Sequence, residues 1–392
     1  MPKATRLAKQ FTASPTIAMN DKAKQLAAEG HAVIGLAGGE PDFDTPPHIV
    51  EAAVKALRDG ETRYAAPSKG IAPLLEAIAA KSERDSGLRL NPMSDIIVTP
   101  GGKLALFLAL KAMLDPGDEV LIPAPYWVSY PSVVTMIGGM PVTIETTSDD
   151  SYRLRLEQLR AQVTPRTKAI IINSPSNPTG HMLSSEEIEA VATLALEADL
   201  FIISDEIYEK LNFDGRPALS LASIPEIADR VVILNGMSKA YAMTGWRLGW
   251  LAGPAEVIGA AGKFNSQTAT SAATFTQHAA VAALNGPQDC VEEMRQAYQE
   301  RRDFIVSGFN SIPNMSSPDI EGAFYAFPKV DRTTKSSDEV ANIILEKAVV
   351  VGVPGSAFGI TRDAHIRFSF AEDMNKLREA VERIGAMAHL LA

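Results

Sequence analysis

The sequence is poor in cysteine and histidine. Cys290 is the single cysteine among 392 residues, and there are six histidines. A lone cysteine cannot form a disulfide within the chain, and the histidines do not combine with it at the spacing of a zinc site. We therefore expect no metal centre. Because unpaired thiols are typical of reducing compartments, we also predict a cytoplasmic protein.

Long hydrophobic runs are missing as well. The longest strongly apolar run covers residues 104–110 and is bracketed by Lys103 and Lys111. It is far shorter than the roughly 20 residues that cross a bilayer. The run therefore predicts a helix buried in a core, and we expect no membrane partner.

Positive charge is scarce relative to negative charge. The chain has 37 Lys and Arg against 47 Asp and Glu, which gives a formal net charge of −10, and no basic tract interrupts it. Binding to nucleic acid requires clustered basic residues, so we expect no nucleic-acid partner. The remaining composition is that of a globular protein, with 46% hydrophobic residues. The length exceeds the roughly 250–300 residues at which single cores stop growing, which predicts two domains.

Two hydrophobic periods alternate along the first three quarters of the chain. A helical period is found in residues 49–57, 104–113 and 184–194, and Ser184 with Glu187 has the spacing of a capping box. Short apolar runs bounded by turn residues lie between the helices, at residues 120–122, 142–144, 169–172, 201–203, 231–234 and 248–252. Continuous apolar strands separated by helices predict an α/β fold with a mostly parallel sheet covered by helices on both faces.

The pattern changes at about residue 291. A long polar helix is expected over residues 291–309, strands over residues 322–327 and 365–370, and a closing helix with Leu377, Val381, Ile384 and Leu391 on one stripe. We predict a large domain over residues 46–290 and a smaller α+β domain over residues 291–392. Residues 1–45, rich in glycine and proline, are expected to form an arm and a substrate loop that belong to the small domain.

Polar clusters follow three of the apolar runs, at residues 173–180, 204–208 and 235–239. In an open parallel sheet the ligand crevice lies outside the carboxyl ends of the strands, so we expect these clusters to share one crevice. Each cluster also has an ordinary interpretation, as a turn, a helix cap or an exposed lysine. Their convergence on one crevice is what favours a functional site.

At this point the sequence resembles the fold-type I aminotransferases that depend on pyridoxal 5'-phosphate, and specifically the aspartate-aminotransferase-like branch of class I. The resemblance runs nearly end to end, through motifs in one order: Gly39-Glu40-Pro41-Asp42-Phe43, Tyr64, Pro100-Gly101-Gly102-Lys103, Pro125-Tyr126-Trp127, Asn177-Pro178-Thr179-Gly180, Ser204-Asp205-Glu206-Ile207-Tyr208, Ser238-Lys239, Thr244-Gly245-Trp246-Arg247 and Arg367.

The resemblance implies the roles of the central residues. Lys239 matches the lysine that forms a Schiff base with the cofactor, and a lysine gains that reactivity where burial and cationic neighbours disfavour its charge. Asp205 matches the partner of the pyridine nitrogen. Asn177 and Tyr208 match the hydrogen-bonding pair to the phenolic oxygen, and Trp127 matches the aromatic side chain that stacks on the ring.

The resemblance also implies a phosphate site. Gly101, Gly102 and Lys103 precede an expected helix, whose N-terminal N–H groups bind anions. Ser238 would add a hydroxyl donor and Arg247 a planar guanidinium. Tyr64 matches a tyrosine that reaches the phosphate held by a neighbouring subunit, which implies a homodimer.

For the substrate, Arg367 matches the arginine that binds the α-carboxylate in bidentate fashion, and Gly39 matches a backbone donor to the same carboxylate. Trp127 and Asn177 are expected to contact substrate too. Lys103 resembles the contact for a distal carboxylate, but its residue type equally suits an exposed lysine beside the phosphate loop.

Two positions depart from the family pattern. Relatives that accept prephenate carry a basic residue just ahead of the Ser14-Pro15-Thr16 segment, where this chain has Thr12. The family's serine three positions before the lysine is Gly236 here. The first departure disfavours prephenate, and the second predicts that one phosphate contact is missing or replaced.

The resemblance therefore implies an enzyme that exchanges amino groups between amino acids and 2-oxo acids. We expect L-aspartate and 2-oxoglutarate to give oxaloacetate and L-glutamate by a ping-pong mechanism. The alternatives are transamination of aromatic amino acids, prephenate or another substrate, and β-elimination at a carbon–sulfur bond, because a fold does not settle the reaction. A regulator that only senses the cofactor is disfavoured, since no segment could supply a basic DNA-binding module.

Overall fold

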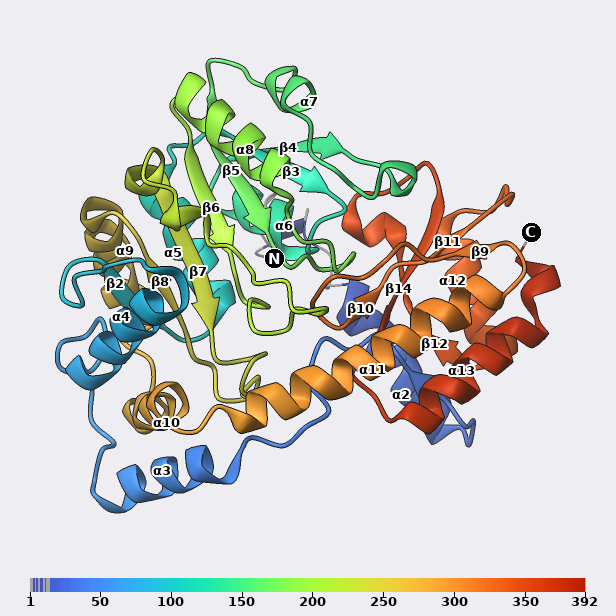
Figure 1. The fold of residues 1–392 in the computed structure, drawn as a ribbon, viewed down its shortest axis with the longest axis horizontal. Helices are drawn as coiled ribbons and strands as arrows, with labels where there is room; N and C mark the ends of the chain where they lie inside the picture. The colour runs from blue at the N-terminus through green and yellow to red at the C-terminus, as the bar shows by residue number, and fades with distance from the viewer. Residues whose placement is uncertain (1–2, 4, 6–7, 10, 12–14, 392) are drawn as a thin grey trace.

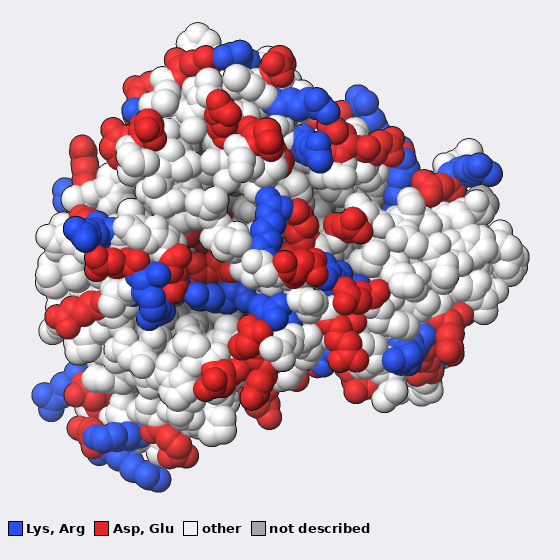
Figure 2. Space-filling view, in the orientation of Figure 1, with Lys and Arg blue, Asp and Glu red and all other residues white. Residues whose placement is uncertain are grey.

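The computed structural model describes residues 3, 5, 8, 9, 11 and 15–391. Thr12 and Ser14, on which the expectation about prephenate depends, lie outside these residues. Among the described helices, none combines the length and the apolar character that a membrane span requires. Basic and acidic side chains are interspersed over the face shown in Figure 2, which is hollowed near its centre.

The larger part of the molecule is built on a seven-stranded sheet (Figure 1). Its strand order is β2-β8-β7-β6-β5-β3-β4, and the pairs among β4, β3, β5, β6 and β7 are parallel. The strands are β2 (Ile96–Thr99), β3 (Glu119–Ala124), β4 (Met140–Glu145), β5 (Thr167–Asn173), β6 (Phe201–Asp205), β7 (Val231–Gly236) and β8 (Gly249–Ala252). The predicted mostly parallel α/β sheet is confirmed.

Helices cover both faces of this sheet, because successive apolar residues of each strand point to opposite sides. Along β5, Ala169 and Ile171 pack against one group of helices, and Ile170 and Ile172 against the other. The first group is α5 (Gly102–Met113), α6 (Ser129–Met136) and α9 (Ala255–Thr268). The second is α3 (Pro47–Arg58), α4 (Ala72–Ser86), α7 (Leu156–Arg160), α8 (Ser185–Glu197) and α10 (Thr274–Asn285).

Two strands interrupt the regular pattern. β8 runs antiparallel to both of its neighbours, β7 and β2. Strand β2 was not predicted, although its four residues are all buried. The apolar run of β2 is short and lies just before Gly101 and Gly102, so the sequence pattern favours a loop there. Only the pairing with β8 shows that it is a strand.

The smaller part of the molecule contains an antiparallel sheet in the order β10-β14-β11-β9, with β13 also paired to β14. Its strands are β9 (Met315–Ser316), β10 (Tyr325–Ala326), β11 (Lys329–Val330), β13 (Val353–Pro354) and β14 (Ala364–Ser369). Its core also includes helices α11 (Asp289–Ser311), α12 (Ser337–Ala348) and α13 (Met374–Ala386). The long helix α11 runs from the side of α10 to the side of α13 (Figure 1).

The described part of residues 1–45, expected to form an arm and a loop without sheet strands, does contain a strand. Helix α2 (Pro15–Ala28) lies there, and β1 (Ile34–Gly35) pairs in parallel with β12 (Val350–Val351). The neighbouring Leu36 N donates to Val351 O at 2.9 Å. A strand of two residues has no readable period, so only its partner reveals it.

Two expectations in the C-terminal part need correction. The strand expected over residues 322–327 is reduced to β10, because Ala323 has a φ of +60° and interrupts the extended backbone. Leu391 is buried as expected, but it lies beyond the end of α13, after a short 3₁₀ turn at Ala388–Leu390.

Candidate active site

A cavity of about 530 Å³ lies at the carboxyl ends of β5, β6 and β7, which end at Asn173, Asp205 and Gly236. Parallel strands bring the residues that follow them to one edge of the sheet. The predicted site residues that line this cavity are Gly39, Gly102, Lys103, Trp127, Asn177, Asp205, Tyr208, Ser238, Lys239, Arg247 and Arg367. Residues more than 300 positions apart in the sequence therefore share one cavity.

Lys239 follows β7 and places its ammonium group in this cavity. Its Nζ donates a hydrogen bond to the carbonyl oxygen of Gly39. Burial lowers the pKa of Lys239 to about 8; Glu40 opposes this effect, and Arg367 and Arg247 add to it. The side chain therefore loses its proton far more readily than an exposed lysine, as a nucleophile or a general base requires.

Asp205 ends β6 and is 3% exposed. Burial raises the pKa of Asp205 to about 6, against the opposing effect of hydrogen bonds from Tyr130 and the Ile207 backbone. The Tyr130 hydroxyl donates to Oδ2 at 2.6 Å, and Ile207 N donates to Oδ1 at 3.3 Å. Above about pH 6 the site therefore holds a buried anion that is fixed in position and suited to a cationic partner.

Arg367 lies on β14, where all six residues are buried, and is 2% exposed. A solvent-exposed arginine on an alternating strand is thereby excluded. Nη1 donates to Asn177 Oδ1 at 3.0 Å, and Nη2 donates to Ala37 O at 2.7 Å. Within the described residues Nε has no hydrogen-bond partner. A buried guanidinium with a spare donor beside a cavity is suited to binding a carboxylate.

Aromatic side chains form part of the walls. The Tyr208 and Tyr325 hydroxyls are 2.9 Å apart, and the Tyr325 ring lies 4.5 Å from the guanidinium carbon of Arg367. The Trp127 ring packs edge-on against Tyr130, with centroids 5.4 Å apart. Lys103 Nζ lies 5.3 Å from the centroid of the Trp127 ring. Partial burial lowers the pKa of Lys103, and the positive charge of Arg247 lowers it further.

Helix α5 begins at Gly102 beside Arg247, which makes an anion cradle at this end of the cavity. Gly101 has a φ of +86°, and a Cβ there would lie 2.4 Å from Arg247 Nη2, so glycine is required for the close approach. At Gly236 a Cβ would lie 2.9 Å from Leu248 O and 3.0 Å from Gly249 Cα. The backbone at residue 236 thus leaves no room for the serine that the family pattern predicts.

Two predicted residues do not line the cavity, and several lining residues, Tyr130 and Tyr325 among them, were not predicted as site residues. Gly101 lies just behind the lining, against Arg247. Tyr64 is 82% exposed and lies away from the cavity of its own chain. Tyr130 lies three residues after Trp127, and Tyr325 lies in an aromatic segment that was predicted only as a strand. Their closeness to predicted motifs is the one sequence signal for them, and their burial is visible only in the structure.

Among the described residues, no group of three or more His, Cys, Asp or Glu is arranged to hold a metal ion. A family model described as aminotransferase class I and II matches residues 31–384. The chain belongs to this family.

Relatives of known name agree with this placement over nearly the full chain. The aspartate aminotransferase of Geobacillus stearothermophilus is 45% identical over 390 residues, covering 98% of each chain. The aspartate/prephenate aminotransferase of Nitrosomonas europaea is 44% identical, covering 95% of this chain and 96% of its own. The solved structure of the Thermus thermophilus aspartate aminotransferase with maleate superposes with a TM-score of 0.93 at 41% identity, covering 98% of this chain and all of that one.

Class I and II aminotransferases use pyridoxal phosphate, and the donors of this cavity fit that group. The N-terminus of α5 and Arg247 suit a phosphate dianion, and the buried carboxylate of Asp205 suits a protonated ring nitrogen. The partly deprotonated Lys239 suits an aldehyde carbon. The guanidinium of Arg367, which lines the same cavity, suits a carboxylate.

Proposed function

We propose that this aminotransferase moves the amino group of L-aspartate to 2-oxoglutarate, forming oxaloacetate and L-glutamate in a ping-pong reaction. The observation that carries the proposal is the buried Arg367 guanidinium, which lines the cavity that also holds Lys239 and Asp205 and whose Nε has no hydrogen-bond partner among the described residues. Aspartate aminotransferase relatives at 45% and 41% identity, one of them solved with maleate, support a four-carbon dicarboxylate as substrate.

Pyridoxal phosphate, when bound, supplies an aldehyde carbon that links to amines and a ring that accepts the electrons released when a Cα–H bond breaks. Lys239 is proposed as the amine that holds the cofactor and, once displaced by substrate, as the base that takes the Cα proton through Nζ. Asp205 keeps a proton on the ring nitrogen, because its buried carboxylate is stabilised by a cation opposite it.

The other cavity residues bind and orient. Arg367 holds the α-carboxylate, with Gly39 beside it, and Lys103 at the Trp127 side of the cavity is proposed to contact the distal carboxylate. Tyr208 and Asn177 are proposed as hydrogen-bond donors to the phenolic oxygen, and Trp127 as the face against the ring. Gly101, Gly102, Ser238 and Arg247 are proposed to hold the phosphate.

The reaction is tested by product analysis on the purified enzyme loaded with pyridoxal phosphate. With L-aspartate and 2-oxoglutarate we expect oxaloacetate and glutamate in equal amounts, and parallel lines in double-reciprocal plots. Prephenate or aromatic 2-oxo acids as preferred acceptors would favour the aromatic or prephenate alternative. Ammonia and pyruvate released from a cysteine conjugate, without a new amino acid, would favour the carbon–sulfur lyase.

Replacement of Arg367 by lysine is expected to raise KM for every amino acid by a similar factor. The change removes the planar pair of donors and costs about 2 kcal/mol, which is roughly 30-fold in KM. The measurement is a set of KM values for aspartate, glutamate and an apolar amino acid. Arg362→Lys is the matched control, because Arg362 is 78% exposed and pairs with Glu145 away from the cavity. A change confined to the dicarboxylic substrates would assign Arg367 to the distal carboxylate instead.

We also propose that the chain acts as a homodimer. Tyr64 is 82% exposed and lies outside the cavity of its own chain, as expected for a side chain that serves the site of a second copy. Sedimentation at micromolar concentration should give twice the chain mass of 42.0 kDa. A fully active monomer would contradict this assignment of Tyr64.

A further inference from the structure

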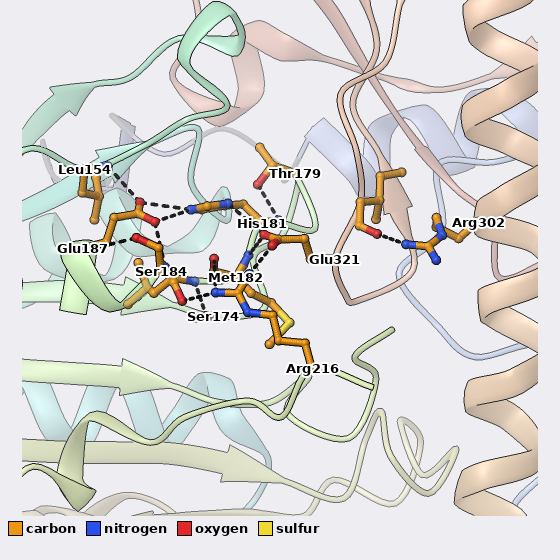
Figure 3. Close-up of polar contacts among 12 residues, drawn as sticks. Leu154, Ser174, Thr179, His181, Met182, Ser184, Glu187, Arg216, Arg302 and Glu321 are labelled. Carbon is orange, nitrogen blue, oxygen red and sulfur yellow. Dashed lines mark hydrogen bonds and ion pairs between the residues drawn. The ribbon is translucent and has the colours of Figure 1, made fainter. Parts of the chain in front are cut away.

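His181 lies between two carboxylates that come from distant parts of the chain (Figure 3). Its Nε2 is 3.0 Å from both carboxylate oxygens of Glu187, in the first turn of α8. Its Nδ1 is 3.1 Å from Glu321 Oε2, in the segment that leads into β10. A protonated imidazole therefore joins the β5–α8 loop to the smaller part of the molecule.

Both carboxylates are held firmly by other donors. Glu187 forms a capping box with Ser184 and accepts from Leu154 N at 2.9 Å. Glu321 accepts from Met182 N at 2.8 Å and forms an ion pair with Arg216. Because other donors hold both carboxylates in place, the attraction of the His181 imidazolium for them draws the two backbone segments together.

Backbone hydrogen bonds continue the same junction. The N–H groups of Glu321 and Gly322 both donate to Gly180 O, at 3.0 and 2.9 Å. Arg302 of α11 donates to Ile320 O at 2.5 Å and pairs with Asp214 at 2.8 Å. The segment around Glu321 is thus fastened on one side to the loop and on the other to the long helix.

Each of the two joined segments carries a side chain that contacts Arg367, which also contacts Phe358 and the Ala37 carbonyl oxygen. Asn177, four residues before His181, accepts from Arg367 Nη1 at 3.0 Å. Tyr325, four residues after Glu321, places its ring 4.5 Å from the guanidinium carbon. A shift of one segment against the other would change these two contacts of the arginine that the proposed reaction uses for the α-carboxylate.

The bridge lies outside the catalytic cavity. His181, Glu187 and Glu321 line a separate, larger cavity of about 1080 Å³. His181 also borders a space of about 50 Å³ beneath the loop, together with Asn177 and Tyr130. The other charged groups that line the larger cavity near His181 are Arg153, Asp214, Arg216, Arg302, Asp303 and Asp319.

We infer that His181 is a positioning residue: its imidazolium, between Glu187 and Glu321, holds the Asn177 loop against the Tyr325 segment and so sets the orientation of Arg367 toward substrate. The inference deepens the proposed transamination and rests on it for the role of Arg367. It adds a residue that does not touch substrate or cofactor but acts through two that line the site.

The bridge has a defined pH range. Burial acts to lower the pKa of His181, but hydrogen bonds and charge from Glu187 and Glu321 outweigh it and raise the pKa to about 9 from an ordinary value of 6.5. Because the pKa in the folded protein is higher than in the unfolded chain, the stabilisation is complete below about pH 6.5 and is lost as the pH rises through about 9. The bridge is intact at neutral pH.

The test compares His181→Asn and Glu321→Gln with the control His389→Asn, in which the exposed His389 of the last 3₁₀ turn is changed. In the loaded enzyme at about pH 7.5, backbone hydrogen exchange is measured by mass spectrometry, and kcat and KM for aspartate are measured separately. We expect faster exchange in residues 174–184 and 319–325, about tenfold higher KM and kcat within about threefold. The control should match the wild type.

The inference is supported only if exchange in both segments and KM change together in at least one of the two variants. Any other combination overturns it, including altered KM with unchanged exchange. If both variants fail to fold, histidine NMR of the wild type decides: a resonance that titrates near pH 9 supports the bridge, and six histidines that all titrate near 6.5 overturn it. If instead the wild type does not transaminate aspartate, the proposed function fails. The exchange rates of residues 174–184 and 319–325 still show whether the His181 bridge holds the two segments together.

Discussion

Lys239→Ala should lower kcat for transamination by at least about 10,000-fold, because in the proposed reaction this one amine both holds the cofactor and moves the Cα proton. Few side chains could replace it: among the described residues, the other basic groups that line the cavity are Lys103, Arg247 and Arg367, and a guanidinium does not act as a base in proteins. Single-turnover rates with aspartate, measured at a fixed cofactor loading, separate lost chemistry from lost binding.

Two further variants make this result specific. Lys239→Arg keeps the positive charge but cannot act as a base, so it should be as inactive as the alanine variant. Lys263→Ala, which changes an exposed lysine of α9, should keep wild-type rates. Substantial turnover by Lys239→Arg would mean that charge at this position matters rather than a free amine.

Asp205→Asn is expected to lower kcat by about 1,000-fold, because an amide cannot stabilise a proton on the ring nitrogen. The substitution is nearly isosteric, and the Tyr130 hydroxyl that donates to Oδ2 at 2.6 Å retains an acceptor. Protein stability should therefore change little, and the loss should appear in kcat more than in KM. Thermal unfolding and steady-state kinetics of the loaded variant measure both.

The neighbouring Glu206 supplies a matched control. It is also a buried carboxylate, but it accepts from Ser204 at 2.8 Å and Ser220 at 2.7 Å outside the cavity lining. Burial raises the pKa of Glu206 to about 7, so the neutral Glu206→Gln side chain is close to a state the protein already adopts. Its kcat should stay within about threefold of the wild type. Equal losses in the two variants would indicate a general effect of the β6 end rather than a role for Asp205.

The sequence was sufficient to predict the parallel sheet and most of the cavity. Runs such as residues 169–172 are apolar at every position because both faces of β5 are covered, and a run of this kind is readable without a partner. The polar residues after β5, β6 and β7 then had to meet at one edge, which brought Asn177, Asp205 and Lys239 together.

Other features depended on contacts that no local pattern encodes. β1 has two residues and is defined by its pairing with β12, more than 300 residues away. Tyr325 lies beside Arg367 because β10 pairs with β14, a contact that no local pattern shows. His181 is one of several polar residues in a loop, and its position between two carboxylates follows from the packing of Glu321 against that loop.

Trapping the cofactor chemically tests the central claim most directly. The protein is loaded with pyridoxal phosphate, reduced with borohydride and digested, and the peptides are analysed by mass spectrometry. We predict a pyridoxyl group on the peptide that contains Lys239, and its near-complete loss when excess L-aspartate is added before reduction. A label on another lysine, or a label on Lys239 that aspartate does not diminish, would contradict the account.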